Sequence, residues 1–140
     1  MFTFGVHACM SGSTEFGSLQ IHTEGGRALA RALRSNVALC RLNIRLNRLG
    51  DEGGRAILDV VRSHPRLDSL DLAHNGLGTL AARALCKCLA NNNHLWELDL
   101  SGNEFTGDSG SSIREALESN QSVQVGHACT HVILSNPNRK

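Results

Sequence analysis

Hydrophobic and polar positions recur along this chain with a period of 28 residues. The repeated pattern is L-x-x-L-x-L-x-x-N-x-L, with Ile or Phe replacing Leu at single positions. Its copies begin at Leu39, Leu67 and Leu95, so both intervals are 28 residues (67 − 39 and 95 − 67). Self-similarity at one fixed period predicts stacked structural units that share a continuous core.

The first half of each copy predicts a short β-strand. In the L-x-L triplet, Leu42 and Ile44 face one side of the strand and Asn43 faces the other. An asparagine follows at the point where the chain turns away, and its amide can bond backbone groups that the turn leaves unpaired. These asparagines are Asn47, Asn75 and Asn103. We therefore predict a structural ladder of stacked asparagines.

The second half of each copy predicts a helix. Apolar residues recur there at positions i, i+1, i+4 and i+5, which form one stripe at the helical period. Four such stripes begin at Ala28, Ala56, Ala84 and Ser112. Each helix is expected to end at an Asn or His, namely Asn36, His64, Asn92 and Asn120. Thr23 and Asp51 are the predicted N-caps of the first two helices.

This frame of alternating strand and helix is that of a leucine-rich repeat. It predicts an α/β solenoid with parallel strands on the concave face and helices on the convex face. We divide the chain into an N-terminal segment with a degenerate first strand (1–20), the solenoid (21–122), and a degenerate terminal repeat with a polar tail (123–140). Apolar residues near both ends indicate that something else covers these ends of the solenoid: Phe2, Phe4, Val6, Val125, Val132, Ile133 and Leu134.

Composition narrows the class of partner. The 140 residues carry a net charge of +1, which predicts no general affinity for nucleic acid or membranes. No apolar run approaches the ~18 residues of a membrane span, and the first residues do not read as a secretory signal. The five cysteines are an odd number, which favours reduced thiols and a cytoplasmic location.

The sequence contains only weak signals for a metal, phosphate or catalytic site. The seven histidines form no H-E-x-x-H motif, and Cys86 and Cys88 lie ~200° apart around a helix, so they do not share a metal ion easily. His127, Cys129 and His131 alternate along one segment and could hold zinc, although an exposed polar strand is the favoured reading. Asp51–Gly54 lacks a phosphate-loop signature. We therefore expect no catalytic residues, metal, cofactor or small-molecule substrate.

The informative residues are those whose type the repeat frame does not require. On the strand face they are Arg41, Asn43, Arg45, Asp71, Glu97 and Asp99, with Trp96 beside them. On the outer helix face, stacking lines up Arg27, Arg55 and Arg83. Both faces are expected to run from basic to acidic along the stack. Either they are ordinary solvated surfaces, or they dock an acidic partner at one end and a basic partner at the other.

Two resemblances sharpen this interpretation. The repeat length and the segment N-x-L-G-D-E-G-G-R-A, from Asn47 to Ala56, resemble the ribonuclease-inhibitor class of leucine-rich repeats over roughly Ile21 to Val123. The segment L-N-I-R-L-N-R-L-G-D-E-G-G also resembles the leucine-rich-repeat subunit family of the nexin–dynein regulatory complex, and Arg45-Leu46 is its most telling part. The second resemblance implies a non-catalytic piece of the linker between axonemal doublets.

Three functions are therefore weighed. The favoured hypothesis is an interaction scaffold that binds other protein subunits of a cytoskeletal assembly, in the cytoplasm and in the axoneme of a cilium or flagellum. The alternative is a soluble cytosolic binder or inhibitor of the ribonuclease-inhibitor or immune-sensor type, although a short solenoid has little curvature to wrap a partner. An enzyme or GTPase activator is disfavoured, because no catalytic arginine can be identified.

The cysteine count yields one testable prediction. Thiol titration of the denatured, non-reduced protein should find all five cysteines free. Two or four missing thiols would indicate disulfides and contradict the cytoplasmic assignment.

Overall fold

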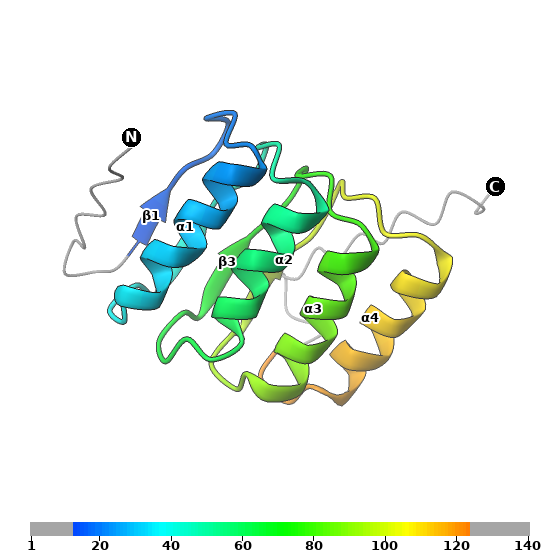
Figure 1. The fold of residues 1–140 in the computed structure, drawn as a ribbon. Coiled ribbons are helices and arrows are strands. Elements are labelled where there is room, and N and C mark those ends of the chain that lie inside the picture. Colours follow the sequence, from blue (N-terminus) through cyan, green and yellow to red (C-terminus); the bar gives the residue numbers. More distant parts are fainter. Residues whose placement is uncertain (1–12, 124–140) are drawn as a thin grey trace.

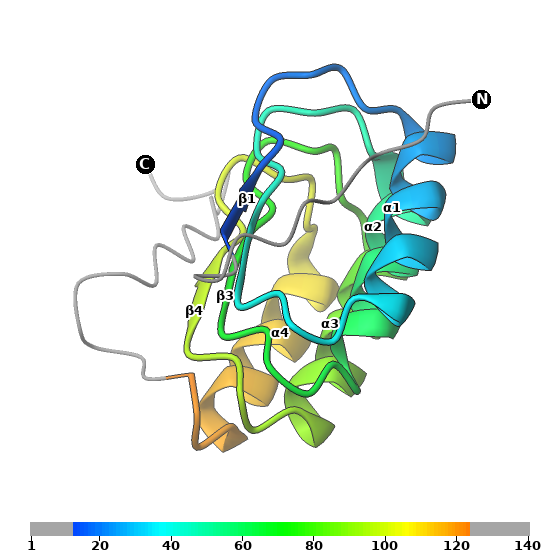
Figure 2. The ribbon, with the colours of Figure 1, turned by 90° about the vertical axis from the view of Figure 1, so that its left-hand side faces the viewer.

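The computed structural model describes residues 13–123, in which four strands alternate with four helices (Figure 1). The strands are β1 (Ser13–Glu15), β2 (Arg41–Asn43), β3 (Ser69–Asp71) and β4 (Glu97–Asp99). The helices are α1 (Thr23–Ser35), α2 (Gly50–Val61), α3 (Thr79–Asn91) and α4 (Gly107–Ser119). Strands and helices form two layers, seen edge-on in Figure 2. None of these helices is long and apolar enough to cross a membrane.

The strands form one parallel sheet in the order β1-β2-β3-β4. Thr14 pairs with Leu42, Leu42 with Leu70, and Leu70 with Leu98, so the sheet register equals the repeat length. This confirms the predicted α/β solenoid. β1 also belongs to the sheet, although the leucine pattern is not recognisable there. Strand pairing is possible without that pattern because backbone hydrogen bonds do not require a particular side chain.

The core lies between the two layers, where the apolar positions of both halves of the repeat meet. The strand leucines Leu42, Leu70 and Leu98 are at most 1% exposed, and Ile57 and Leu85 of the helices are fully buried. Burying each such side chain contributes roughly 1.5–3 kcal/mol. Because every unit buries its leucines against the next one, the core is continuous along the stack.

The predicted asparagine ladder is present. The Asn47 amide nitrogen donates to the Ile44 carbonyl of its own unit (2.9 Å) and to the Phe16 carbonyl of the preceding unit (2.8 Å). Asn75 makes the equivalent bonds, to the Leu72 and Ile44 carbonyls. Each amide therefore joins two successive turns of the solenoid, which confirms the structural role predicted for these residues.

A second ladder runs along the ends of the helices. The Asn92 side-chain oxygen accepts the N–H groups of His94 and Leu95 (both 2.8 Å), and its nitrogen donates to the Val61 carbonyl (2.8 Å). Asn36 and Asn120 close the chain after their own helices through the same kind of accepted bonds. The polar residue expected at each helix end therefore holds the loop that leads to the next strand.

His64 replaces asparagine in this second ladder. Its Nδ1 accepts the N–H groups of Arg66 (3.3 Å) and Leu67 (3.0 Å), so the ring proton must lie on Nε2. Nε2 then donates to the Asn36 carbonyl of the preceding unit at 2.6 Å. One neutral tautomer of histidine thus makes the same two kinds of bond that an asparagine side chain makes.

The predicted N-caps Thr23 and Asp51 are wrong. α1 and α2 begin at Thr23 and Gly50, and neither start has a side-chain capping bond. The Asp51 carboxylate instead accepts three N–H groups at the start of the following helix, from Gly78 (3.0 Å), Leu80 (2.9 Å) and Ala81 (2.7 Å). A capping bond between units cannot be recognised from local sequence, because the donors lie 27 to 30 residues away.

We predict that His64→Asn leaves stability nearly unchanged, whereas His64→Ala lowers the free energy of unfolding by about 1–3 kcal/mol. Alanine leaves the N–H of Leu67 without its acceptor, while asparagine restores the acceptor. Urea denaturation of the three proteins measures the difference. Equal midpoints for the wild type and His64→Ala would show that this rung of the ladder does not contribute to stability.

Candidate interaction surfaces

The candidate residues lie on two opposite faces of the solenoid. The sheet brings Arg41, Ser69 and Glu97 into one row across neighbouring strands. Arg27, Arg55 and Arg83 lie on α1, α2 and α3, in the helical layer. The structure therefore does not combine the predicted residues into a single site, and each face must be considered by itself.

A second row across the strand face consists of Asn43, Asp71 and Asp99. Each side chain accepts the backbone N–H two residues later, at 3.1 Å for Asn43, 3.0 Å for Asp71 and 2.9 Å for Asp99. These side chains thus hold the turn that follows each strand, a structural role that the sequence analysis missed. Their recurrence at the 28-residue period was the available signal.

The carboxyl group of Asp71 in this row is electrostatically perturbed. Partial burial raises the pKa of its carboxyl group, and the neighbouring carboxylates Asp99 and Glu15 raise the pKa further. The hydrogen bond from Ala73 and the charge of Arg45 act in the opposite direction. The strand face also departs from the expected basic-to-acidic progression, because β1 places the exposed Glu15 ahead of Arg41.

Exposed side chains that could contact a partner lie at both ends of the strands. Trp96, immediately before β4, is 46% exposed, and its backbone N–H donates to the Asp68 carbonyl at 2.9 Å. Arg41 and Arg45 are exposed at the start of β2 and just beyond its end. An exposed tryptophan on a rigid backbone, together with arginines, is typical of residues that dominate protein interfaces.

On the helix face, two of the three arginines in the predicted ridge are paired internally. Arg27 lies 3.1 Å from Glu24 and 3.8 Å from Glu52, while Arg55 lies 3.4 Å from Glu52 and 3.6 Å from Asp59. Arg83 makes no ion pair with any residue in the described part of the chain. Glu24 and Glu52 thus neutralise the first two arginines of the ridge, a pairing that was not predicted from the sequence.

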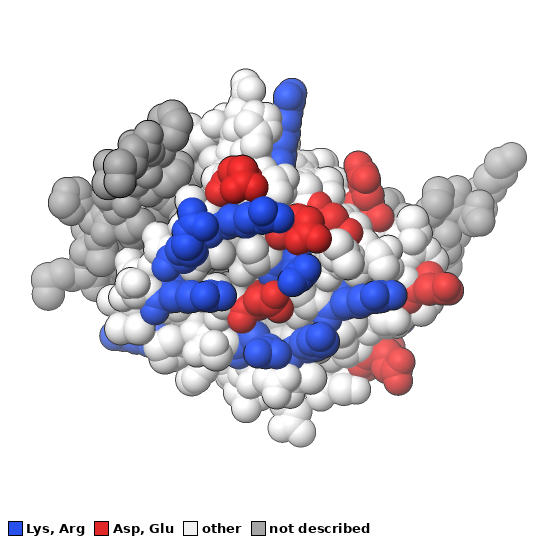
Figure 3. Space-filling model, viewed as in Figure 1, with Lys and Arg blue, Asp and Glu red and all other residues white. Residues whose placement is uncertain are grey.

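The helix face is nevertheless predominantly basic over α1 to α3, and Figure 3 shows this face towards the viewer. The basic residues there are Arg27, Arg31, Arg34, Arg55, Arg62, Arg83 and Lys87. A surface hollow of about 340 Å³ lies between α1 and α2, and one of about 240 Å³ lies between α2 and α3. On α4 the balance is reversed, because Asp108, Glu115 and Glu118 outnumber Arg114.

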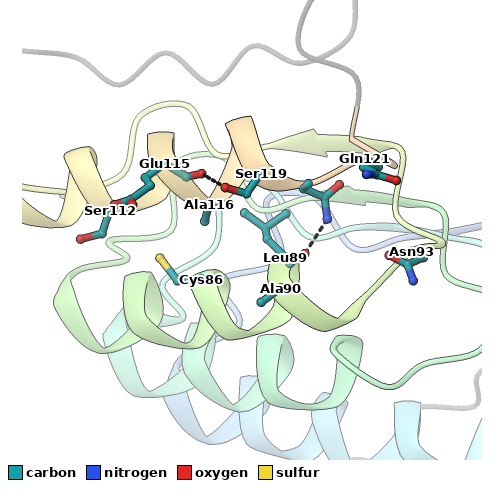
Figure 4. A pocket seen from close by; sticks show the side chains of 10 residues that line it. Cys86, Leu89, Ala90, Asn93, Ser112, Glu115, Ala116, Ser119 and Gln121 are labelled. Carbon is teal, nitrogen blue, oxygen red and sulfur yellow. Dashed lines mark hydrogen bonds between the residues drawn. The ribbon is translucent and has the colours of Figure 1, made fainter.

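A larger hollow of about 580 Å³ lies between α3 and α4, lined by residues such as Cys86, Leu89 and Glu115 (Figure 4). Burial raises the pKa of the Cys86 thiol, and the charge of Glu115 raises it further. Burial also raises the pKa of Cys88 to about 12. Both thiols are therefore protonated near neutral pH and are poor nucleophiles.

The structure adds no support for the metal and phosphate sites considered from the sequence. Within residues 13–123, no group of three His, Cys, Asp or Glu side chains could hold a metal ion. The zinc candidates His127, Cys129 and His131 lie outside the described residues. The Asp51–Gly54 segment is used for packing and capping: a Cβ atom on Gly53 would lie 3.3 Å from the Thr23 Cα. The apolar residues expected at the chain ends are likewise outside the described part.

Comparisons with known proteins agree with this geometry. A leucine-rich repeat family model matches residues 38–58, 65–86 and 91–113. The three matched segments are leucine-rich repeats. They coincide with the three clearest copies of the 28-residue pattern, which begin at Leu39, Leu67 and Leu95. No curated protein matches the chain.

The solved structure of the leiomodin-1 actin-binding site 2 has the same fold. Its TM-score against this chain is 0.73 at 21% sequence identity, and the alignment covers 80% of this chain and 66% of the leiomodin chain. At this identity the likeness establishes the fold alone. Leucine-rich repeats are in general non-catalytic modules that bind proteins, which identifies the exposed faces described above as the places to look for function.

We predict that Asp71→Asn stabilises the protein at neutral pH. Since the folded-state pKa of Asp71 is raised, its ionised form is disfavoured in the folded state, and this penalty is present above the folded pKa and disappears at acid pH. Asparagine keeps the turn, as Asn43 does, and removes the repulsion from Asp99, which is worth up to about 1 kcal/mol.

Denaturation at pH 7 and at pH 3 measures this effect. The gain in unfolding free energy should be present at pH 7 and absent at pH 3, where the carboxyl group is protonated. A gain of equal size at both pH values would assign the effect to packing rather than to charge.

Proposed function

We propose that this protein is a non-catalytic scaffold that binds protein partners on two opposite faces at once. The observation that carries the proposal is the division of the candidate anchors. Arg41, Arg45 and Trp96 are associated with the strands, whereas Arg83 belongs to the helical layer. Two separated surfaces suit a subunit that joins other proteins, whereas an inhibitor that wraps one partner uses mainly the concave face.

At a finer level, we propose a cytoskeletal assembly, specifically the nexin–dynein regulatory complex that links axonemal doublets. The L-N-I-R-L-N-R-L-G-D-E-G-G segment from Leu42 to Gly54 supports this assignment through its similarity to the complex's leucine-rich-repeat subunit. The partners are then other protein subunits of the axoneme. The location is the cytoplasm and the cilium or flagellum.

Two alternatives are kept for testing. One is a soluble cytosolic binder or inhibitor of the ribonuclease-inhibitor or immune-sensor type, which the repeat class equally permits. The other is actin binding, which the name of the leiomodin structure raises for a cytoskeletal leucine-rich repeat protein. Co-sedimentation of the purified chain with actin filaments distinguishes actin binding from the axonemal proposal.

The central experiment is co-purification of the tagged full chain from ciliated cells. We compare Arg41→Glu/Arg45→Glu, Arg27→Glu/Arg55→Glu/Arg83→Glu and Trp96→Ala, with Arg114→Glu on α4 as a charge-reversal control. A tryptophan at the centre of an interface costs over ~2 kcal/mol when truncated, so its partner should be lost from the eluate. The two charge variants should lose different partners.

The results separate the levels of the proposal. Axonemal proteins in the wild-type eluate support the finer assignment, and their absence in favour of one soluble protein supports the binder alternative. If every variant recovers the same partners at the same salt concentration, both faces are ordinary solvated surfaces and the two-face scaffold is wrong.

A further inference from the structure

The basic residues of the convex face lie on both sides of Asp59, an acidic residue of α2. The hollow between α1 and α2 is lined by Asp59 together with Arg31 and Arg34, and the hollow between α2 and α3 by Asp59 together with Arg83 and Lys87. The two hollows therefore share two lining residues, Asp59 and its ion-pair partner Arg55. This arrangement follows from the 28-residue stacking, which places Arg31, Asp59 and Lys87 in one row across three helices.

Most of these cations are not neutralised by residues within the described range 13–123. Arg27 and Arg55 are paired with Glu24, Glu52 and Asp59. The remaining five make no ion pair with any residue between 13 and 123, and all five are exposed: Arg31, Arg34, Arg62, Arg83 and Lys87. The described surface thus carries unpaired positive charge on both sides of Asp59.

We propose that the convex face of α1, α2 and α3 binds an acidic protein segment whose Asp and Glu side chains pair with these five cations. The proposal rests on the scaffold function above and names the chemistry of one of its partners. Helix axes lie roughly 8–10 Å apart, and an extended chain rises ~3.3 Å per residue. In an extended segment that crosses the helices, about every third residue therefore lies over the next helix.

The composition of the face favours an acidic protein segment over nucleic acid or an anionic membrane. Glu24, Glu52 and Asp59 interrupt the basic surface, and a continuous phosphate backbone would meet these carboxylates. The side chains that line both hollows include no aromatic residue on which a base could stack. Arginine guanidinium groups instead match carboxylates in paired, planar geometry.

The test measures binding of the purified full chain to a fluorescent oligoglutamate peptide by anisotropy, with oligoglutamine as the neutral probe. Wild type should bind oligoglutamate only, and affinity should fall steeply as salt screens the charges. Arg31→Glu/Arg34→Glu should weaken binding by about tenfold or more. Arg48→Glu/Arg114→Glu changes the net charge equally at exposed positions outside α1, α2 and α3 and should leave binding unchanged within about twofold.

Asp59→Asn provides a test of the opposite sign. The substitution removes the negative charge between the two hollows and releases Arg55 from its 3.6 Å pairing. Oligoglutamate affinity should therefore rise about two- to threefold, the effect of one exposed charge pair. A purely structural role of Asp59 would not increase affinity. Circular dichroism and thermal melting verify that each variant is folded.

Several results would overturn the proposal. Absence of oligoglutamate binding would refute it, and so would equal losses in the two double variants, which would indicate a net-charge effect. Tighter binding of a DNA duplex or of phosphatidylserine vesicles, lost in Arg31→Glu/Arg34→Glu, would assign the face to those ligands instead. Failure here would leave the scaffold function intact if co-purification still depended both on Arg41, Arg45 and Trp96 and on Arg27, Arg55 and Arg83.

Discussion

The hydrogen bonds that each asparagine makes to two successive units are the interaction on which the rest of this structure depends. Asn47 and Asn75 join carbonyl groups on neighbouring turns of the solenoid. At the helix ends, Asn92 and His64 join a carbonyl group of the preceding unit to N–H groups of their own loop. Because these bonds connect residues about 28 positions apart, they hold every unit in the same register. Leucines at equivalent positions are then buried against one another without any adjustment of the backbone.

This register also determines where charge accumulates. A residue on the outer helix face has its counterpart on the next helix, so Arg27, Arg55 and Arg83 occupy equivalent places on three neighbouring helices. Like charges at equivalent positions are brought side by side, and the protein tolerates them because they are exposed and because Glu24 and Glu52 neutralise some of them. The basic convex face is thus a direct consequence of stacking similar units.

Exposed residues on such a scaffold can change with little loss of stability, because the core depends on the leucine and asparagine positions. The strand face is an instructive exception. Asn43, Asp71 and Asp99 are exposed enough to meet a partner, yet each also closes the turn after its strand. Substitutions at these positions therefore affect folding as well as recognition, whereas Arg31 or Trp96 can vary with little effect on the core.

The fold and the first asparagine ladder could be predicted from the sequence, because the 28-residue period, the alternating leucines and the helical stripes are local patterns whose physics does not depend on distant residues. Tertiary structure decided the interactions between units. The pairing of Asp51 with the start of α3, the place of β1 in the sheet and the placement of cations on both sides of Asp59 all involve residues far apart in the chain. Contacts between units depend on the direction in which each side chain points. A single sequence specifies the spacing of residues along the chain but not which side chains of different units meet.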